Sequence, residues 1–256
     1  MNENTTVEFE VFGDLALFAN PVYSCGSEHY TYKLPTPGAL KGVLDNIYFK
    51  PTFFWVVDKI RVMNKMDTTV LNRTILSMKG TDRATYTYLK NVRYQVQAHL
   101  EWNMQRPHLA QDRKLDKHMT IFKRALMHGG RRPIFLGMSD CVAYVKPCTF
   151  GEGVGYYDNS GEVEFDPMYH SYTYPSEVSV DDKVYGDGNM YVNMYVPVMQ
   201  NGVIDVPAAK ECTARRFVRE WTKKELEDSL NLPHKPVNLV DEDEVACGFG
   251  EVEVNG

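Results

Sequence analysis

The sequence predicts an α+β fold in which a sheet with two helices is followed by a smaller antiparallel β subdomain. Residues 92–102 alternate between apolar and polar side chains, which is typical of a strand with one buried face. Residues 40–47 and 115–126 instead carry apolar side chains at helical spacing. Strand patterns precede, separate and follow these two helical stripes. The first 146 residues therefore have the predicted order β-α-β-β-α-β.

That order is typical of ferredoxin-like domains, in which two helices cover one face of the sheet. The first strand lies at residues 7–11, where apolar residues alternate with glutamates. The first helix starts after Thr36, which can cap it, and Pro37 suits the first helical position. Pro51 ends this helix, and the apolar, β-rich residues 53–62 form the next strand.

A second helix and a last strand complete the predicted domain. The second helical stripe ends at Gly129 and Gly130, and residues 133–144 form the last strand. Residues 61–88 leave room for an additional hairpin before the strand at 92–102.

Beyond Pro147 the sequence changes to short strand patterns that are rich in tyrosine. Residues 190–199 alternate, Asn201-Gly202 is a strong two-residue hairpin turn, and a strand resumes at residue 203. We expect a short helix between residues 214 and 230. The predicted regions are a ferredoxin-like domain at 1–146, a small β subdomain with a terminal helix at 147–230, and an acidic, mobile tail at 231–256.

The composition is that of an ordinary globular protein. Of the 256 residues, 43% are hydrophobic and 24% charged, which excludes wholesale disorder and collagen-like or coiled-coil order. The longest apolar run, residues 53–57, is far shorter than the ~20 residues that cross a bilayer, and no secretory signal begins the chain. We therefore expect a cytoplasmic protein that does not bind a membrane. Its cysteines form no Cys-x-x-Cys pair and are expected to be free thiols: Cys25, Cys141, Cys148, Cys212 and Cys247.

Charge is distributed unevenly along the chain. The formal net charge is −6, but residues 83–132 contain 11 basic and three acidic residues. From residue 220 onward the chain contains 10 acidic residues and three lysines. Because local charge sets the field at a binding surface, the basic segment is a candidate for binding a polyanion. The alternative is that both segments are solvated faces of opposite charge.

The segment 112–118 combines an arginine, two lysines and a histidine near the start of the second predicted helix. A helix N-terminus can bind an anion, histidine can exchange protons near neutral pH, and lysine can stabilise the charge of a phosphorane. In a regular helix Lys117 and His118 point about 100° apart. They converge on one phosphate most easily if the helix begins near Asp116, which would then be its N-cap. The alternative is a solvated basic helix with His118 at the edge of the core.

The sequence predicts no metal site and no nucleotide-binding loop. Cys25 and His29 are spaced like two ligands, but no second pair lies at the spacing of a structural zinc site. The glycines at 151–155 lack the downstream glycine and helix of a dinucleotide-binding turn. No Gly-x-Ser-x-Gly motif and no Walker loop occurs.

Two stretches resemble a known family. The first is Tyr23-Ser24-Cys25-Gly26-Ser27-Glu28-His29-Tyr30-Thr31-Tyr32-Lys33-Leu34-Pro35-Thr36-Pro37-Gly38-Ala39-Leu40-Lys41-Gly42. The second is Pro133-Ile134-Phe135-Leu136-Gly137-Met138-Ser139-Asp140-Cys141. Over residues 5–230 the chain resembles the CRISPR-associated endoribonucleases of type I-C systems, the d subtype of the fifth Cas family within the RAMP superfamily.

The resemblance implies a fold, an activity and partners. Members of this family combine a ferredoxin-like RAMP domain with a small β-sheet domain. They cleave precursor CRISPR RNA at the base of the repeat hairpin without a metal or other cofactor. They then hold the crRNA 5′ handle in the interference complex, beside its backbone and large subunits.

The resemblance also implies a catalytic set. The family's catalytic tyrosine follows the first helix and its lysine–histidine pair opens the second, which matches Tyr48, Lys117 and His118. The expected reaction is attack of the ribose 2′-OH on the adjacent phosphorus, giving 2′,3′-cyclic phosphate and 5′-OH ends. Lys117 would stabilise the phosphorane, whereas the roles of Tyr48 and His118 as base and acid stay open.

Cations of the basic segment are the predicted contacts to the RNA backbone: Arg106, Arg113, Lys114, Lys123, Arg124, Arg131 and Arg132. Three alternatives stay open on the sequence. The chain could be a non-catalytic crRNA-binding subunit of the effector complex, a metal-dependent DNase, or a generic RNA-recognition domain, although no strand motif typical of RNA-recognition domains occurs.

Overall fold

The computed structural model describes residues 5–77, 80–178 and 186–231. The tail predicted at 231–256 lies outside the described residues except for Asn231, and Cys247 lies outside them too. The chain forms two compact units, Met1–Trp221 and Thr222–Gly256. Within the described ranges no helix is long and apolar enough to span a membrane, and Cys25, Cys141, Cys148 and Cys212 are free.

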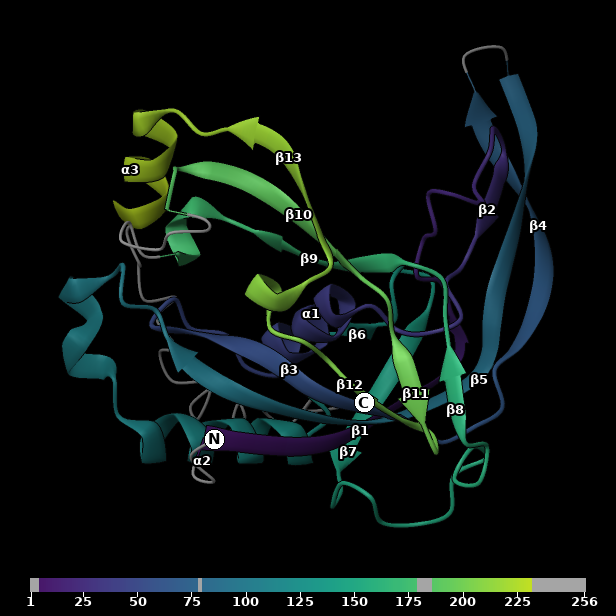
Figure 1. Cartoon of the computed structure of the whole chain (residues 1–256), viewed down its shortest axis with the longest axis horizontal. Helices are drawn as coiled ribbons and strands as arrows, with labels where there is room; N and C mark the ends of the chain where they lie inside the picture. Colours follow the sequence, from purple (N-terminus) through teal and green to yellow (C-terminus); the bar gives the residue numbers. More distant parts are fainter. Residues whose placement is uncertain (1–4, 78–79, 179–185, 232–256) are drawn as a thin grey trace, which may run out of the picture. The chain divides into compact units, whose positions relative to one another are not determined.

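The centre of the first unit is an antiparallel sheet in the strand order β7-β1-β5-β3 (Figure 1). One helix follows β1 and one follows β5, so the chain order is β-α-β-β-α-β and the predicted ferredoxin-like fold is confirmed. These elements are β1 (Thr6–Ala16), α1 (Pro37–Ile47), β3 (Phe53–Val62), β5 (Gly80–Trp102), α2 (Leu115–Met127) and β7 (Val142–Pro147).

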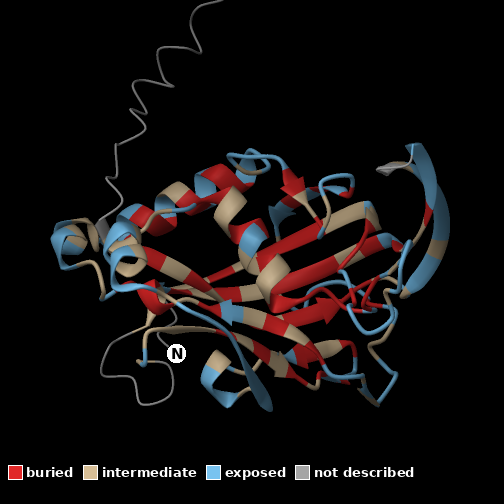
Figure 2. Ribbon diagram, turned by 90° about the horizontal axis from the view of Figure 1, so that it is seen from above, coloured by how far each residue is buried: buried red, intermediate tan, exposed pale blue. Residues whose placement is uncertain are grey.

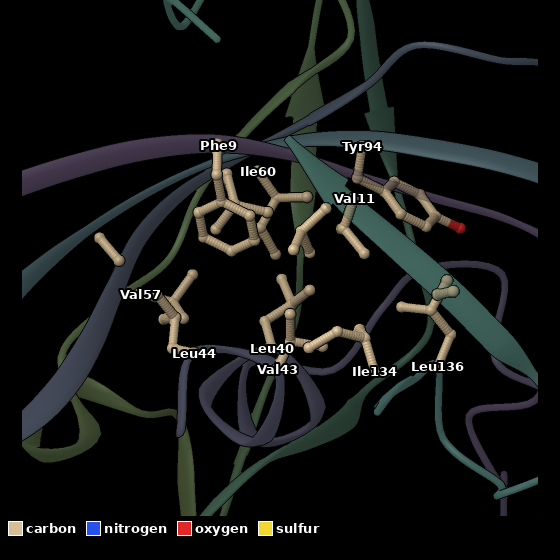
Figure 3. Packing of buried hydrophobic residues seen from close by; sticks show 14 of the residues in the cluster. Phe9, Val11, Leu40, Val43, Leu44, Val57, Ile60, Tyr94, Ile134 and Leu136 are labelled. Atoms are coloured by element: carbon tan, nitrogen blue, oxygen red, sulfur yellow. The ribbon is translucent and has the colours of Figure 1, made fainter. Parts of the chain in front are cut away.

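The two helices bury apolar stripes against one face of this sheet. Leu40, Val43 and Leu44 of α1 point toward Phe9 and Val11 of β1 (Figure 3). On α2, the ring centroid of Phe122 lies 4.8 Å from that of Trp55 in β3. Complete burial of such a side chain contributes about 1.5–3 kcal/mol. The apolar stripes predicted for the two helices therefore lie in the main hydrophobic core, together with residues of the sheet.

Helix α1 begins and ends as its sequence predicts. The Thr36 hydroxyl accepts a hydrogen bond from the Ala39 amide at 3.2 Å, and Pro37 is the first helical residue. Helix α2 differs from the expectation, because it begins at Leu115 with Lys114 as N-cap and not at Asp116. Asp116 instead lies in the first turn, where it is exposed.

The additional hairpin that the sequence left open is present. Strand β4 (Asp67–Ser77) pairs with the first half of β5, and β2 (Glu28–Tyr30) pairs in parallel with β5 on its other side. Figure 1 shows these strands extending beyond the helices as an arm, and Figure 2 shows that much of its outer end is exposed. The strand predicted at 92–102 is therefore the inner half of a longer strand.

Strands beyond Pro147 join two different sheets. Strands β12, β11 and β8 continue the main sheet from β3, whereas β13, β10 and β9 form a separate three-stranded antiparallel sheet. The predicted turn at Asn201-Gly202 joins β11 to β12, with φ angles of 49° and 81°. The strands are β8 (Glu162–Glu164), β9 (Met168–Thr173), β10 (Asn189–Tyr195), β11 (Val198–Gln200), β12 (Val203–Asp205) and β13 (Ala214–Glu220).

Two predicted elements differ from the structure. Residues 214–220 form β13 because they pair with β10, and only α3 (Lys223–Asn231), in the second unit, is helical. The strand expected at 133–144 is divided into β6 (Ile134–Phe135) and the start of β7, with Gly137 in the connection. Three short 3-10 helices complete the described elements: η2 (Pro107–Asp112), η3 (Pro175–Glu177) and η4 (Ala209–Glu211). The domain boundary at 146–147 stays a prediction.

Candidate active site

Tyr48 is fixed at the C-terminal end of α1. It is the C-cap of the helix, and its backbone amide donates to the Leu44 carbonyl at 2.9 Å. Its own carbonyl accepts a hydrogen bond from Trp55 Nε1 at 2.9 Å. The side chain is only 1% exposed and its ring lies 5.7 Å from that of Phe53. The tyrosine is therefore held by both its backbone and its ring.

His118 lies in the first turn of α2, directly against Tyr48. The Tyr48 hydroxyl lies 2.8 Å from His118 Nδ1, and the backbone carbonyl of Asp112 lies 2.7 Å from Nε2. Because a carbonyl can only accept, Nε2 carries a proton. In the neutral ring Nδ1 is then the acceptor and the Tyr48 hydroxyl is its donor. The imidazole is packed against Phe53 and Trp102 and is 0% exposed.

Burial shifts the pKa values of both groups. It raises the pKa of Tyr48 to about 12, although the nearby Arg131 opposes the shift. Burial also lowers the pKa of His118, against the effect of the Asp112 carbonyl and carboxylate. The two residues are therefore a neutral phenol and a neutral imidazole at neutral pH.

Lys117 is connected to His118 through the side chain of Asp112. Its Nζ donates to Asp112 Oδ1 at 2.6 Å, and the Thr52 hydroxyl donates to Oδ2 at 3.0 Å. Asp112 Oδ2 also lies 3.6 Å from His118 Nε2. The three predicted catalytic residues are thus joined in one network, with Asp112 between Lys117 and His118.

The network is open to solvent on one side only. The side chain of Lys117 is 50% exposed and that of Asp112 is 30% exposed, whereas Tyr48 and His118 are buried. As expected from the angle of about 100° between consecutive helical residues, Lys117 and His118 leave α2 in different directions. The structure is therefore a closed form, in which a large substrate can reach the lysine but not the imidazole.

Comparison with known proteins assigns the chain. The sequence profile of the CRISPR-associated protein family Cas5, subtype d, matches residues 6–207. The chain belongs to this Cas5 family. The resemblance inferred from residues 23–42 and 133–141 is thereby confirmed.

Individual relatives agree with the family assignment. The chain is 25% identical over 235 residues to the CRISPR pre-crRNA endoribonuclease Cas5d of Mannheimia succiniciproducens, covering 78% of this chain and 94% of that protein. A protein of the same name from Thermus thermophilus is 28% identical over 152 residues, which are 55% of this chain and 63% of that protein. The crystal structure of a CRISPR-associated protein has 30% identity and a TM-score of 0.65, over 82% of this chain and 96% of that one.

The predicted RNA contacts of this Cas5 protein fall into two groups. Five are exposed at the N-cap of α2, on the helix, or on the connection after it: Lys114, Lys123, Arg124, Arg131 and Arg132. The backbone amides of the last two both donate to the Asn46 carbonyl at 3.1 Å, which fixes this connection at the end of α1. Arg131 thereby lies 5.1 Å from the Tyr48 ring centroid. These five cations remain available to a polyanion.

The other two predicted contacts are half-buried. Arg113 donates through Nη2 to the carbonyls of Asn103 and Arg106, at 3.0 and 3.1 Å, so it braces the segment before α2. Burial lowers the pKa of Arg106. Arg113 thus supports the shape of this segment, and the role of both arginines in RNA binding stays a prediction.

Sequence reasoning missed two residues of the network and one neighbouring cation. Thr52 gave no signal, because a single threonine before a strand has many structural roles. Asp112 belonged to the basic segment, but no local pattern gave it a role of its own, and the sequence indicated Asp116 as N-cap only for a helix that begins there. Lys50 is close enough to His118 to lower the pKa of the histidine, and the pattern around Pro51 indicated only a helix end. Among the described residues no group of three or more His, Cys, Asp or Glu is arranged to hold a metal ion.

Proposed function

We propose that this chain is a metal-independent endoribonuclease that cleaves precursor CRISPR RNA at the base of the repeat hairpin. After cleavage it stays on the crRNA 5′ handle in the interference complex, with the backbone and large subunits as partners. The observation that carries the proposal is the 2.8 Å hydrogen bond between the Tyr48 hydroxyl and His118 Nδ1, beside Lys117. The names of the relatives, which are pre-crRNA endoribonucleases, support the same activity.

The hydrogen-bond directions favour one assignment of the roles. The ribose 2′-oxygen attacks phosphorus as its proton passes to the Tyr48 oxygen. The Tyr48 proton passes to His118 Nδ1, and the Nε2 proton passes to the 5′-oxygen as the P–O5′ bond breaks. One proton thus moves from the 2′-OH to the leaving oxygen, and the products are a 2′,3′-cyclic phosphate and a 5′-OH. This relay needs no tyrosinate before the reaction, which fits the raised pKa of Tyr48.

Cations supply the second part of the chemistry. The phosphorane carries more negative charge than the phosphodiester, so a nearby cation stabilises it more than the ground state. Lys117 is a half-exposed cation within the network, and the Arg131 guanidinium lies 5.1 Å from the Tyr48 ring centroid. We assign phosphorane stabilisation to Lys117. Arg131 and the exposed cations of α2 would bind the adjacent RNA backbone.

Cleavage requires the closed form to open. With His118 0% exposed, its Nε2 proton can reach a 5′-oxygen only when Asp112 withdraws from it. Asp112 ends the exposed segment η2, which carries no buried residue. We therefore expect RNA binding to move this segment away from the buried Tyr48–His118 pair.

The test combines substrate and enzyme variants. A repeat RNA with 2′-deoxyribose at the cut should not be cleaved, and EDTA should leave cleavage of the all-ribose RNA unchanged. His118→Ala should lower the single-turnover rate by about 10³-fold or more, because general acid–base catalysis contributes on the order of 10²–10⁴. The matched control is His128→Ala, since His128 is exposed at the other end of α2. Cleavage that survives the deoxy substitution, or that stops in EDTA, contradicts the mechanism.

Burial of Tyr48 and His118 favours a second candidate function. A polar pair enclosed among aromatic rings can simply stabilise the join between α1 and α2, and the chain would then be a crRNA-binding subunit without chemistry. In that case the purified protein binds labelled repeat RNA but leaves it intact. His118→Ala would then lower the melting temperature and change no RNA product.

A further inference from the structure

The carboxylate of Asp112 is surrounded by donors that suit a phosphate. Its two oxygens accept from Lys117 Nζ at 2.6 Å and from Thr52 Oγ1 at 3.0 Å. The protonated Nε2 of His118 lies 3.6 Å from Oδ2. Burial acts to raise the pKa of Asp112, but the hydrogen bonds from Lys117 and Thr52 and the charge of Lys117 leave it lowered, so the group is an anion.

A carboxylate and a phosphodiester use the same kinds of partner. Both are anions that only accept hydrogen bonds, and both are bound by an ammonium group, a hydroxyl and an imidazole N–H. In the mechanism proposed above, the scissile phosphate must lie within reach of Lys117 and His118. Asp112 now occupies both donors, because its carboxylate accepts from Lys117 Nζ and its backbone carbonyl accepts from His118 Nε2.

We propose that Lys117, Thr52 and the Nε2 side of His118 form the binding site for the scissile phosphate, and that Asp112 occupies it as an internal anion until RNA displaces it. The inference rests on the proposed function. It adds Thr52 as a phosphate-binding residue and gives the closed form a role, since the carboxylate keeps other anions out. The side chain of Asp112 is 30% exposed and the residue ends the exposed segment η2, so its carboxylate and its carbonyl can withdraw together when RNA binds.

The test compares two substitutions that remove the same charge. Asp112→Asn removes the internal anion, whereas Asp116→Asn removes a carboxylate that is exposed on α2 four residues later. The readout is the Kd for repeat RNA with 2′-deoxyribose at the mapped cut, measured in one buffer. We expect Asp112→Asn to bind at least fivefold more tightly than Asp116→Asn. Equal affinity of the two variants means that the carboxylate does not compete with RNA and overturns the proposal.

A second variant at the same site should change the RNA affinity in the opposite direction. Thr52→Val keeps the volume of the side chain but removes the hydroxyl, so we expect RNA binding at least threefold weaker than in the wild type. A merely structural network would leave the RNA affinity of both variants unchanged. Unchanged or tighter binding by Thr52→Val therefore overturns the assignment of Thr52 to the phosphate site. If Asp112→Asn does not fold, the Thr52→Val measurement alone tests the proposal.

Failure of the proposed function is recognised separately. If the wild-type protein does not cleave all-ribose repeat RNA, that RNA itself serves as the probe and the same affinities are compared. Absence of cleavage then removes the nuclease assignment, while the order of the affinities still supports or overturns the anion site.

Discussion

At the scale of single residues, the direction of two hydrogen bonds decides the chemistry of His118. The Asp112 carbonyl fixes the proton on Nε2, and this leaves Nδ1 to accept from the Tyr48 hydroxyl. Burial favours the uncharged form of both side chains. The pair is therefore arranged to pass a proton along a line and not to hold a charge.

This arrangement predicts the pH dependence of cleavage. The relay uses neutral His118, so the single-turnover rate should fall as pH falls through the pKa of the histidine, which burial holds below its ordinary value of 6.5. The phenol of Tyr48, with a pKa of about 12, keeps its proton throughout the accessible range. We expect a constant rate from roughly pH 7 to 9 and a loss only on the acidic side.

The opposite profile would show that His118 acts in its protonated form. If a protonated His118 supplies the proton directly, the rate should fall as pH rises above the histidine pKa. The rate is measured at saturating RNA, so that binding does not contribute. His128→Ala is the control, because an exposed histidine outside the network should leave the profile unchanged.

At the scale of the elements, one glycine controls how the connection after β6 passes the end of β1. Gly137 has a φ of 90°, and a Cβ atom there would overlap the Leu17 carbonyl oxygen. The adjacent Leu136 carbonyl accepts from the Leu17 amide at 3.0 Å, which keeps the two segments together. No side chain can be added at Gly137 without separating these backbones.

We therefore predict that Gly137→Ala is severely destabilising. Its matched control is Gly26→Ala, because Gly26 has a φ of 59° but open space around the missing Cβ. Denaturant unfolding should show a loss of about 1–2 kcal/mol for Gly26→Ala, the cost of left-handed backbone, and of more than about 4 kcal/mol for Gly137→Ala. Equal losses would mean that only the φ angle matters and that the close approach does not.

Local signals explain which elements the sequence predicts. Thr36, Pro37 and Pro51 bracket α1, and the bounds of β3 agree with its apolar run at 53–62. Residues 214–220 become a strand through pairing with β10, which is remote in sequence, so no local pattern reveals it. Helix α2 starts one residue before Asp116, with Lys114 as an N-cap that makes no side-chain capping hydrogen bond, so no local capping signal marks this start.

The candidate site could be predicted from the sequence only in part, because some of its features depend on contacts between remote segments. Family resemblance identified Tyr48, Lys117 and His118, and helix geometry predicted that Lys117 and His118 diverge. The burial of Tyr48 and His118 depends on how α1 and α2 pack together, which the sequence pattern does not specify. Thr52 enters the network only because the start of β3 lies beside the end of η2.

At the scale of the whole molecule, the distribution of charge matters more than its sum. The net charge of −6 repels RNA at long range, yet exposed cations gather on α2 and the connection after it. Screening limits both effects to about 8–10 Å at moderate salt. RNA binding must therefore come from close contacts between these cations and phosphates.

Such contacts predict a steep dependence of RNA affinity on salt. Each phosphate contact releases a counterion and contributes about 0.7–0.9 to the slope of log K against log salt concentration. Arg131→Gln should lower the slope by roughly one contact, because Arg131 lies beside Tyr48 and is one of the proposed contacts to the RNA backbone. Lys90→Gln removes the same charge from a lysine that pairs with Asp67 on the arm, and it should leave the slope unchanged. An affinity that stays constant between roughly 50 and 300 mM salt contradicts this interface, and equal slopes for the two variants would place the RNA away from Arg131.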